Sequence, residues 1–76
     1  MSYFEQVKNI LQEYCGEEVE ITPASHLLTD LWLDSIDLAD IAMSVEDVFD
    51  FMIDGEDLEK IHTVQDILDQ IEKNIW

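Results

Sequence analysis

The central helix of this chain is expected to begin within the stretch Leu33-Asp34-Ser35-Ile36-Asp37-Leu38, and the rest of the fold is arranged around that helix. Asp34 is a favourable N-cap residue. Asp37 follows three positions later, where a carboxylate meets free backbone N–H groups and the positive end of the helix dipole. Ser35 is therefore expected in the first helical turn, with its hydroxyl near the surface. A phosphate ester on that oxygen would lie at a helix N-terminus, which is a site suited to anions.

The residues that follow divide into two faces when they are wrapped around a helix at about 100° each. One arc is apolar and is expected to pack against the core. It holds Leu38, Ile41, Ala42, Val45, Val48 and Phe49. The other arc is acidic but also carries Ile36 and Met43. Stray exposed apolar residues are common. The alternative is an apolar spot among carboxylates, which suits a partner that presents Lys and Arg around a hydrophobic hollow.

This pattern resembles the Asp-Ser-Leu motif and second helix of the acyl carrier proteins, and the resemblance runs across nearly the whole chain. The residues that carry it are Asp34-Ser35-Ile36-Asp37, Ile41, Met43, Val45-Glu46-Asp47 and Phe49. The resemblance implies that Ser35 receives 4′-phosphopantetheine, whose terminal thiol holds an acyl chain as a thioester, and that Asp34 fixes the helix start. It also implies that the second helix is the recognition helix for partner enzymes. The docking face would comprise Ile36, Asp37, Asp40, Met43, Glu46 and Asp47.

Helical spacing and helix-end signals elsewhere predict an all-α fold, a small antiparallel bundle. Its three main helices are expected near residues 3–15, 35–50 and 63–74, with a short helix near 56–61. Thr63 is expected to cap the last helix, with Asp66 at its third position. The long connection over residues 17–33 is expected to be a loop rather than a short strand. Its anchoring residues would be Val19, Ile21, Leu27, Leu28 and Leu31.

Length and charge limit the possible functions. Seventy-six residues fit one carrier domain over residues 1–76. Nineteen acids against three Lys give a net charge of −16, which excludes nucleic acid as a partner and favours basic partners. No apolar run approaches the ~18 residues that cross a bilayer, and the N-terminus lacks the pattern of a signal peptide. We therefore expect no membrane span and a monomeric, cytoplasmic protein.

The sequence departs from the fatty-acid carriers at Trp32. Those carriers show Asp-Leu-Gly before the motif, whereas the run here is Asp30-Leu31-Trp32-Leu33. A Leu before Asp-Ser is common in discrete, specialised carriers, so the resemblance leaves fatty-acid, polyketide and related pathways open. We expect Trp32 to pack inward against Leu28 and Leu31, because core packing is the usual role of an aromatic residue. The alternative is that Trp32 points outward and enlarges the docking face.

The sequence lacks the residues that a serine hydrolase, a zinc site or an EF-hand calcium site requires. Ser35 has no Gly-x-Ser-x-Gly elbow, and its only available bases are His26 and His62. We therefore assign no catalytic residue and expect the substrate of other enzymes rather than an enzyme. One Cys and two scattered His do not form a zinc site, and the acidic stretch around Gly55 does not follow an EF-hand loop, so no metal site is assigned.

Two functions from different classes remain. The first is the covalent carrier, whose partners would be a phosphopantetheinyl transferase and acyl-loading and acyl-transferring enzymes with basic docking patches. The second is an unmodified acidic interaction module, acting as an adaptor or a phosphate mimic. The carrier needs the hydroxyl of Ser35, whereas the interaction module does not.

Overall fold

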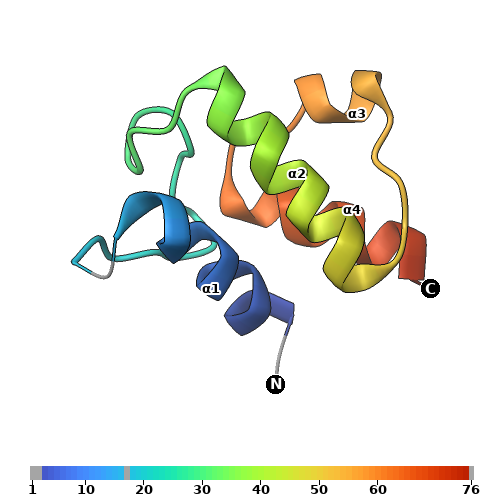
Figure 1. Ribbon diagram of the computed structural model, residues 1–76, viewed down its shortest axis with the longest axis horizontal. Coiled ribbons are helices and arrows are strands. Elements are labelled where there is room, and N and C mark those ends of the chain that lie inside the picture. Colours follow the sequence, from blue (N-terminus) through green and yellow to red (C-terminus); the bar gives the residue numbers. More distant parts are fainter. Residues whose placement is uncertain (1–2, 17, 76) are drawn as a thin grey trace.

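The computed structural model describes residues 3–16 and 18–75, and its elements within these residues are helical. They are α1 (Tyr3–Cys15), α2 (Ser35–Phe49), α3 (Gly55–Glu59) and α4 (Val64–Ile75). α1 packs against both α2 and α4, while the short α3 lies on the other side of α2 in the view of Figure 1. The prediction of an all-α bundle is confirmed, and the three main helices begin and end within one residue of the expected positions. α3 starts and stops earlier than predicted.

The start of α2 is fixed by the predicted capping residues. The backbone N–H of Asp37 donates to Oδ1 of Asp34 at 2.9 Å, and the N–H of Asp34 donates to Oδ2 of Asp37 at 3.3 Å. This reciprocal pair satisfies two N–H groups at the helix start, where none has a partner within the helix. The first turn of α2, and Ser35 with it, therefore has a defined backbone conformation.

The start of α4 is capped in the same way, as predicted. The N–H of Asp66 donates to Oγ1 of Thr63 at 3.2 Å, while Oδ2 of Asp66 accepts from the N–H groups of Thr63 at 3.0 Å and of His62 at 2.8 Å. Burial raises the pKa of the Asp66 carboxyl, but these hydrogen bonds and the neighbouring His62 outweigh burial and hold the pKa below its ordinary value. The ionised form of Asp66 is thus favoured by the fold.

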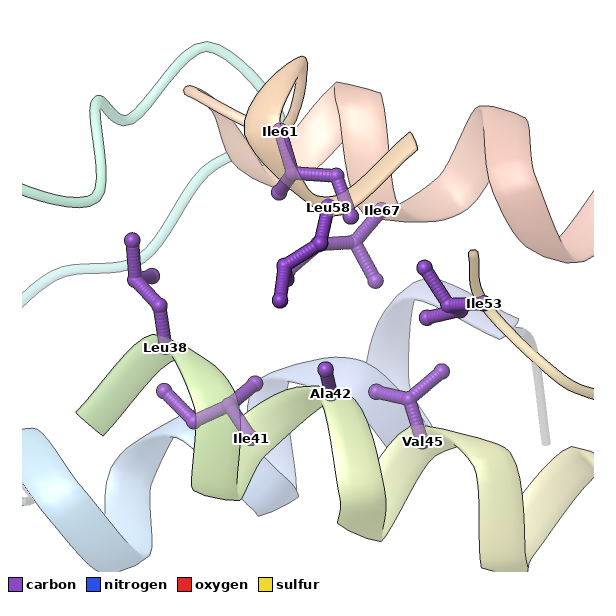
Figure 2. A pocket seen from close by; sticks show the side chains of 8 residues that line it. All are labelled: Leu38, Ile41, Ala42, Val45, Ile53, Leu58, Ile61 and Ile67. Atoms are coloured by element: carbon purple, nitrogen blue, oxygen red, sulfur yellow. The ribbon is translucent and has the colours of Figure 1, made fainter. Parts of the chain in front are cut away.

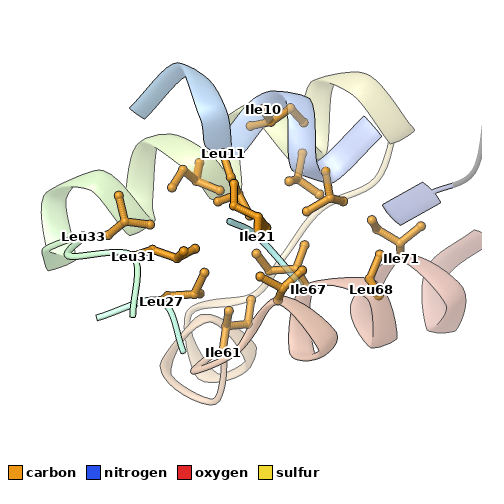
Figure 3. Packing of buried hydrophobic residues seen from close by; sticks show 14 residues of the cluster. Ile10, Leu11, Ile21, Leu27, Leu31, Leu33, Ile61, Ile67, Leu68 and Ile71 are labelled. Atoms are coloured by element: carbon orange, nitrogen blue, oxygen red, sulfur yellow. The ribbon is translucent and has the colours of Figure 1, made fainter. Parts of the chain in front are cut away.

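The hydrophobic core lies where α1, α2, α4 and the long α1–α2 connection meet (Figure 3). Its buried members are Val7, Ile10, Leu11, Ile21, Leu27, Leu31, Leu33, Ile41, Val45, Ile61, Val64, Ile67, Leu68 and Ile71. The connection is a loop anchored by Ile21, Leu27 and Leu31, as predicted. Leu28 and Val48, which were also predicted to lie in the core, are instead 43% and 52% exposed.

The loop is tied to the start of α4 by backbone hydrogen bonds. An isolated antiparallel bridge joins His26 to Thr63, the N–H of Leu27 donates to the carbonyl of His62 at 2.9 Å, and the N–H of Val64 donates to that of Ser25 at 3.1 Å. This contact brings the loop that precedes Ser35 against the turn between α3 and α4.

Within residues 3–16 and 18–75, no helix has both the length and the apolar character needed to span a bilayer.

Candidate functional site

Ser35 is the first residue of α2, and its side chain is exposed. The preceding residue, Asp34, has extended backbone geometry and acts as the N-cap. The predicted place of the hydroxyl, at the surface of the first helical turn, is therefore confirmed. The other serines in the described part of the chain differ from Ser35, because Ser25 is buried and bonded to Thr22, and Ser44 is half-buried in the middle of α2.

An open cavity of about 280 Å³ lies beside Ser35. Its lining is mostly apolar and comes from the long loop, α2 and the α3–α4 region. The lining residues are Leu28, Ser35, Leu38, Leu58, Glu59, Ile61 and His62. Nothing local in the sequence places Leu58, Ile61 or His62 near Ser35. The pairing of the loop with the start of α4 brings these segments together.

A second, much smaller void lies deeper, between α2 and the α3–α4 region. Figure 2 shows side chains of α2 pointing toward those of Ile53, Leu58, Ile61 and Ile67 across this space. The void measures about 10 Å³, which is about the space that one water molecule occupies. Three residues, Leu38, Leu58 and Ile61, line both this void and the cavity beside Ser35. They form the boundary between the surface cavity and the core.

The predicted docking residues fall into two groups along α2. Ile36 is 72% exposed and stands next to Ser35, with Asp37 and the exposed Asp40 in the following turn. Met43, Glu46 and Asp47 lie together near the other end of the helix, where they line one open cavity.

Two of the predicted docking carboxylates also hold the backbone. Asp37 belongs to the capping pair at the start of α2, and Oε2 of Glu46 accepts from the N–H of Ile53 at 2.6 Å. Asp40 and Asp47, by contrast, are exposed. These two side chains are therefore the most exposed acids among the predicted docking residues.

The expectation that Trp32 packs inward is wrong. Its side chain is 83% exposed, and its backbone is left-handed, with φ of 58°. The neighbouring Leu31 and Leu33 are buried and donate backbone hydrogen bonds to the carbonyls of His26 and Leu27. These anchors hold Trp32 in a conformation that costs an ordinary residue about 1–2 kcal/mol. Glycine, which the fatty-acid carriers that the motif resembles have here, adopts this conformation without that cost.

We expect Trp32→Gly to stabilise the fold. The substitution relieves the left-handed strain and loses little packing, and the larger chain entropy of unfolded glycine cancels part of the gain. The free energy of unfolding should rise by about 0.5–1 kcal/mol, measured by urea denaturation. Trp32→Ala is the matched control, because it removes the indole but keeps the strained Cβ, and it should show no comparable gain. A glycine variant no more stable than the alanine variant would contradict this explanation.

The remaining reactive groups do not form a second site. Cys15 is half-buried, and burial raises the pKa of its thiol, with a smaller rise from the Asp37 carboxylate. The thiol is therefore mostly protonated and poorly nucleophilic at neutral pH. Across residues 3–16 and 18–75, no group of three or more His, Cys, Asp or Glu side chains is arranged to hold a metal ion.

Comparisons with known proteins agree with this geometry. Residues 5–71 match the family model described as the phosphopantetheine attachment site. The chain is 50% identical over 74 residues to the acyl carrier protein of Coprothermobacter proteolyticus, and the matched region covers 96% of this chain and 90% of that relative. It is 44% identical over 73 residues to the acyl carrier protein of Thermotoga maritima, covering 95% and 90%.

Among solved structures, a Mycobacterium tuberculosis protein assigned to the acyl carrier proteins superimposes with a TM-score of 0.89 at 28% identity. That match covers 95% of this chain and 97% of the other. Family model, relatives and fold therefore all indicate the same family. This chain belongs to the acyl carrier proteins, which hold acyl intermediates on a 4′-phosphopantetheine group.

Proposed function

We propose that Ser35 is the residue of this carrier to which 4′-phosphopantetheine is attached. The observation that supports this assignment is the exposed hydroxyl at the first residue of α2, beside the 280 Å³ cavity. The capping pair of Asp34 and Asp37 fixes the backbone on which that hydroxyl is presented. Asp34 therefore acts as a positioning residue for the attachment site.

The residues around Ser35 fit a group that is polar at its phosphate and less polar along its length. The hydroxyl is accessible from solvent, and the adjoining cavity offers Leu28, Leu38 and Leu58 to apolar parts of the group or its cargo. Glu59 and His62 supply polar atoms in the same lining. When bound, the group supplies a thiol that holds the acyl chain as a thioester. The protein itself contributes attachment, presentation and partial shelter.

Partner enzymes are proposed to dock on the exposed face of α2, whose residues are Ile36, Asp37, Asp40, Met43, Glu46 and Asp47. These partners are a phosphopantetheinyl transferase and the enzymes that load and transfer acyl groups in fatty-acid, polyketide or related biosynthesis. With a net charge of −16, the carrier attracts surfaces rich in Lys and Arg and repels further copies of itself. The proposal thus describes a single-domain, monomeric, cytoplasmic protein that serves as a substrate rather than an enzyme.

The attachment site can be tested by mass spectrometry. Incubation of the purified protein with coenzyme A and a broad-specificity phosphopantetheinyl transferase should add the mass of one phosphopantetheine group, located on the peptide that contains Ser35. Ser35→Ala should abolish the addition. Ser44→Ala is the matched control, because it removes a half-buried hydroxyl from the same helix and should leave the addition unchanged.

Two results would contradict the assignment. Addition of the group to the Ser35→Ala protein would move the attachment site elsewhere. If an active transferase added no mass to the unaltered protein, the carrier assignment of Ser35 would fail, and an unmodified acidic interaction module would describe the chain better.

A further inference from the structure

His62 is the histidine that reaches the cavity beside Ser35. Its side chain is exposed, and it lines the cavity of about 280 Å³ together with Ser35. A sphere of that volume is about 8 Å across, which is less than the Debye length of about 10 Å at 0.1 M salt. A charge on His62 therefore interacts with a charge attached to the side-chain oxygen of Ser35.

The backbone of His62 is fixed independently of its side chain. Its N–H donates to Oδ2 of Asp66 at 2.8 Å, and its carbonyl accepts from the N–H of Leu27 at 2.9 Å. These bonds hold residue 62 where the long loop meets the start of α4. Because both bonds use backbone atoms of His62, they remain when the side chain is replaced. The imidazole can thus be altered without removing the pairing that forms the cavity.

The ring of His62 stacks on the ring of His26, with the ring centroids 6.3 Å apart and the planes inclined by 20°. Nδ1 of His26 is buried and has no hydrogen-bond partner within residues 3–16 and 18–75. A proton added to that atom would bring a charge out of water without an acceptor, which is unfavourable. His26 also lies outside the cavity lining. Of the two rings, that of His62 is therefore the one placed to carry a positive charge beside Ser35.

The surroundings of Ser35 are rich in negative charge. The two carboxylates of the capping pair lie next to it at the start of α2, and Glu59 adds a third to the cavity lining. No lysine in the described part of the chain lines the cavity. A phosphodiester keeps its negative charge throughout the pH range in which histidine titrates, so attachment of one to Ser35 adds a further negative charge here. Protonated His62 is the group in this lining that can offset it.

The titratable groups around His62 come from three elements. Glu59 of α3 lines the same cavity, Asp66 of α4 has its pKa lowered in part by His62, and His26 of the loop stacks on the ring. Both carboxylates compete with a phosphodiester for the His62 ring. Oδ2 of Asp66, however, already accepts two backbone N–H groups. A phosphodiester on Ser35 differs from both carboxylates because a covalent bond holds it at the edge of the same cavity.

We propose that the imidazole of His62 binds the phosphodiester by which 4′-phosphopantetheine is attached to Ser35, and that this contact holds the base of the group against the α3–α4 turn. The proposal rests on the proposed function, because it assumes attachment at Ser35. It adds a positioning residue from a distant segment and a dependence on pH. The contact forms at about pH 6, where histidine is protonated, and is lost at about pH 8, where histidine is neutral.

The first test follows the phosphorus NMR resonance of the protein loaded from coenzyme A. The resonance should move between about pH 8 and pH 6, the range in which histidines titrate. His62→Gln keeps a polar side chain that cannot be protonated and should remove at least about four-fifths of that movement. His26→Gln is the matched control, because that histidine lies outside the lining, and it should retain more than about half. Equal movement in the His62→Gln and unaltered proteins would overturn the contact.

A second measurement follows the ring protons of the two histidines, which are the only ones in the chain. Attachment of the group should raise the pH midpoint at which His62 titrates by about 0.5–1 unit, as expected for opposite charges about 6 Å apart near the surface. The midpoint of His26 should rise by less than about half as much, and 0.5 M NaCl should reduce both rises. Equal rises at the two histidines would show a general effect of added charge and would overturn the contact.

A pair of unloaded variants separates failure of this contact from failure of the attachment site. Ser35→Asp carries a negative charge at position 35 without an attached group, and Ser35→Asn is its uncharged match. The His62 midpoint should be about 0.3 pH unit higher in the Ser35→Asp protein. Equal midpoints would overturn the contact whether or not Ser35 is modified.

The expected difference between these two variants, combined with no mass added to the unaltered protein by an active transferase, would instead overturn the proposed function and the phosphodiester contact with it. Thermal melting of every variant shows whether the fold is retained.

Discussion

Raising NaCl from 0.1 to 1 M is expected to stabilise the protein by about 3 kcal/mol, because the Debye length falls from ~10 to ~3 Å and screens like charges from one another. The chain carries nineteen acids and three Lys, so its negative side chains outnumber its positive ones by sixteen. These charges lie closer together in the folded chain than in the unfolded one, and folding therefore increases their repulsion. The melting temperature should rise by about 12–24 °C for a domain of this size.

Mild acid is expected to act in the same direction as salt, because protonation lowers the net charge, and the two effects should overlap rather than add. The stabilisation by acid is limited by Asp66, whose pKa lies below its ordinary value in the folded protein. Its stabilising contribution is present above the unfolded pKa of about 3.9 and is lost as the pH falls through the folded value. Stability should therefore pass through a maximum in mild acid and then decline.

The screening effect can be followed by circular dichroism during thermal melting, with NaCl series at pH 7 and in mild acid. The series in mild acid is the internal control, because fewer charges remain there and the dependence on salt should be shallower. A melting temperature that stays constant or falls as NaCl is added at pH 7 would refute self-repulsion as a major cost of folding.

The helices were predictable because their signals are local. The capping pairs at Asp34 and Thr63 each depend on residues three positions apart, and hydrophobic periodicity depends on one helix turn. Val48 shows where this reasoning stops, since periodicity identifies the buried side of α2 but not how far along the helix a neighbouring element covers it. At 52% exposure, Val48 lies on the predicted apolar arc without a covering element.

The surroundings of Ser35 were less predictable than its own position. Leu28, Leu58 and His62 come from three segments, and their meeting depends on the backbone pairing of His26 with Thr63, which leaves no local pattern in the sequence. Trp32 was misplaced for a different reason. The preference of aromatic residues for the core takes no account of the backbone conformation, and the glycine of the fatty-acid carriers at this position indicates that a left-handed residue is needed.

Acyl cargo is expected to stabilise the protein by entering the space bounded by Leu38, Leu58 and Ile61. These residues separate the cavity beside Ser35 from the 10 Å³ void, which is too small for an acyl chain as it stands. Entry therefore requires a side chain to move, and Leu58 is the best candidate. It is half-buried on α3, a helix of five residues with no buried residue among them.

An octanoyl chain on the phosphopantetheine-bearing protein should raise the free energy of unfolding by about 2 kcal/mol. Burial of about four methylenes gives ~3 kcal/mol at ~0.8 kcal/mol each, and displacement of Leu58 offsets part of it. The melting temperature should rise by about 8–16 °C over that of the protein with a free thiol. The measurement is a pair of melting curves, one for the octanoylated protein and one for the protein with a free thiol. The identity of each form is checked by mass spectrometry.

Three variants locate the chain inside the protein. Leu58→Ala should cost the form with a free thiol about 1–3 kcal/mol and should increase the gain from octanoylation, because the chain fills the space that the side chain vacated. Ala42→Leu should fill the void from the α2 side and remove most of the gain. Leu28→Ala is the control, since Leu28 lines only the outer cavity of the two and should leave the gain nearly unchanged. If all three variants show the same gain as the unaltered protein, the acyl chain stays outside the boundary that Leu58 forms, and stabilisation by cargo must come from the surface cavity alone.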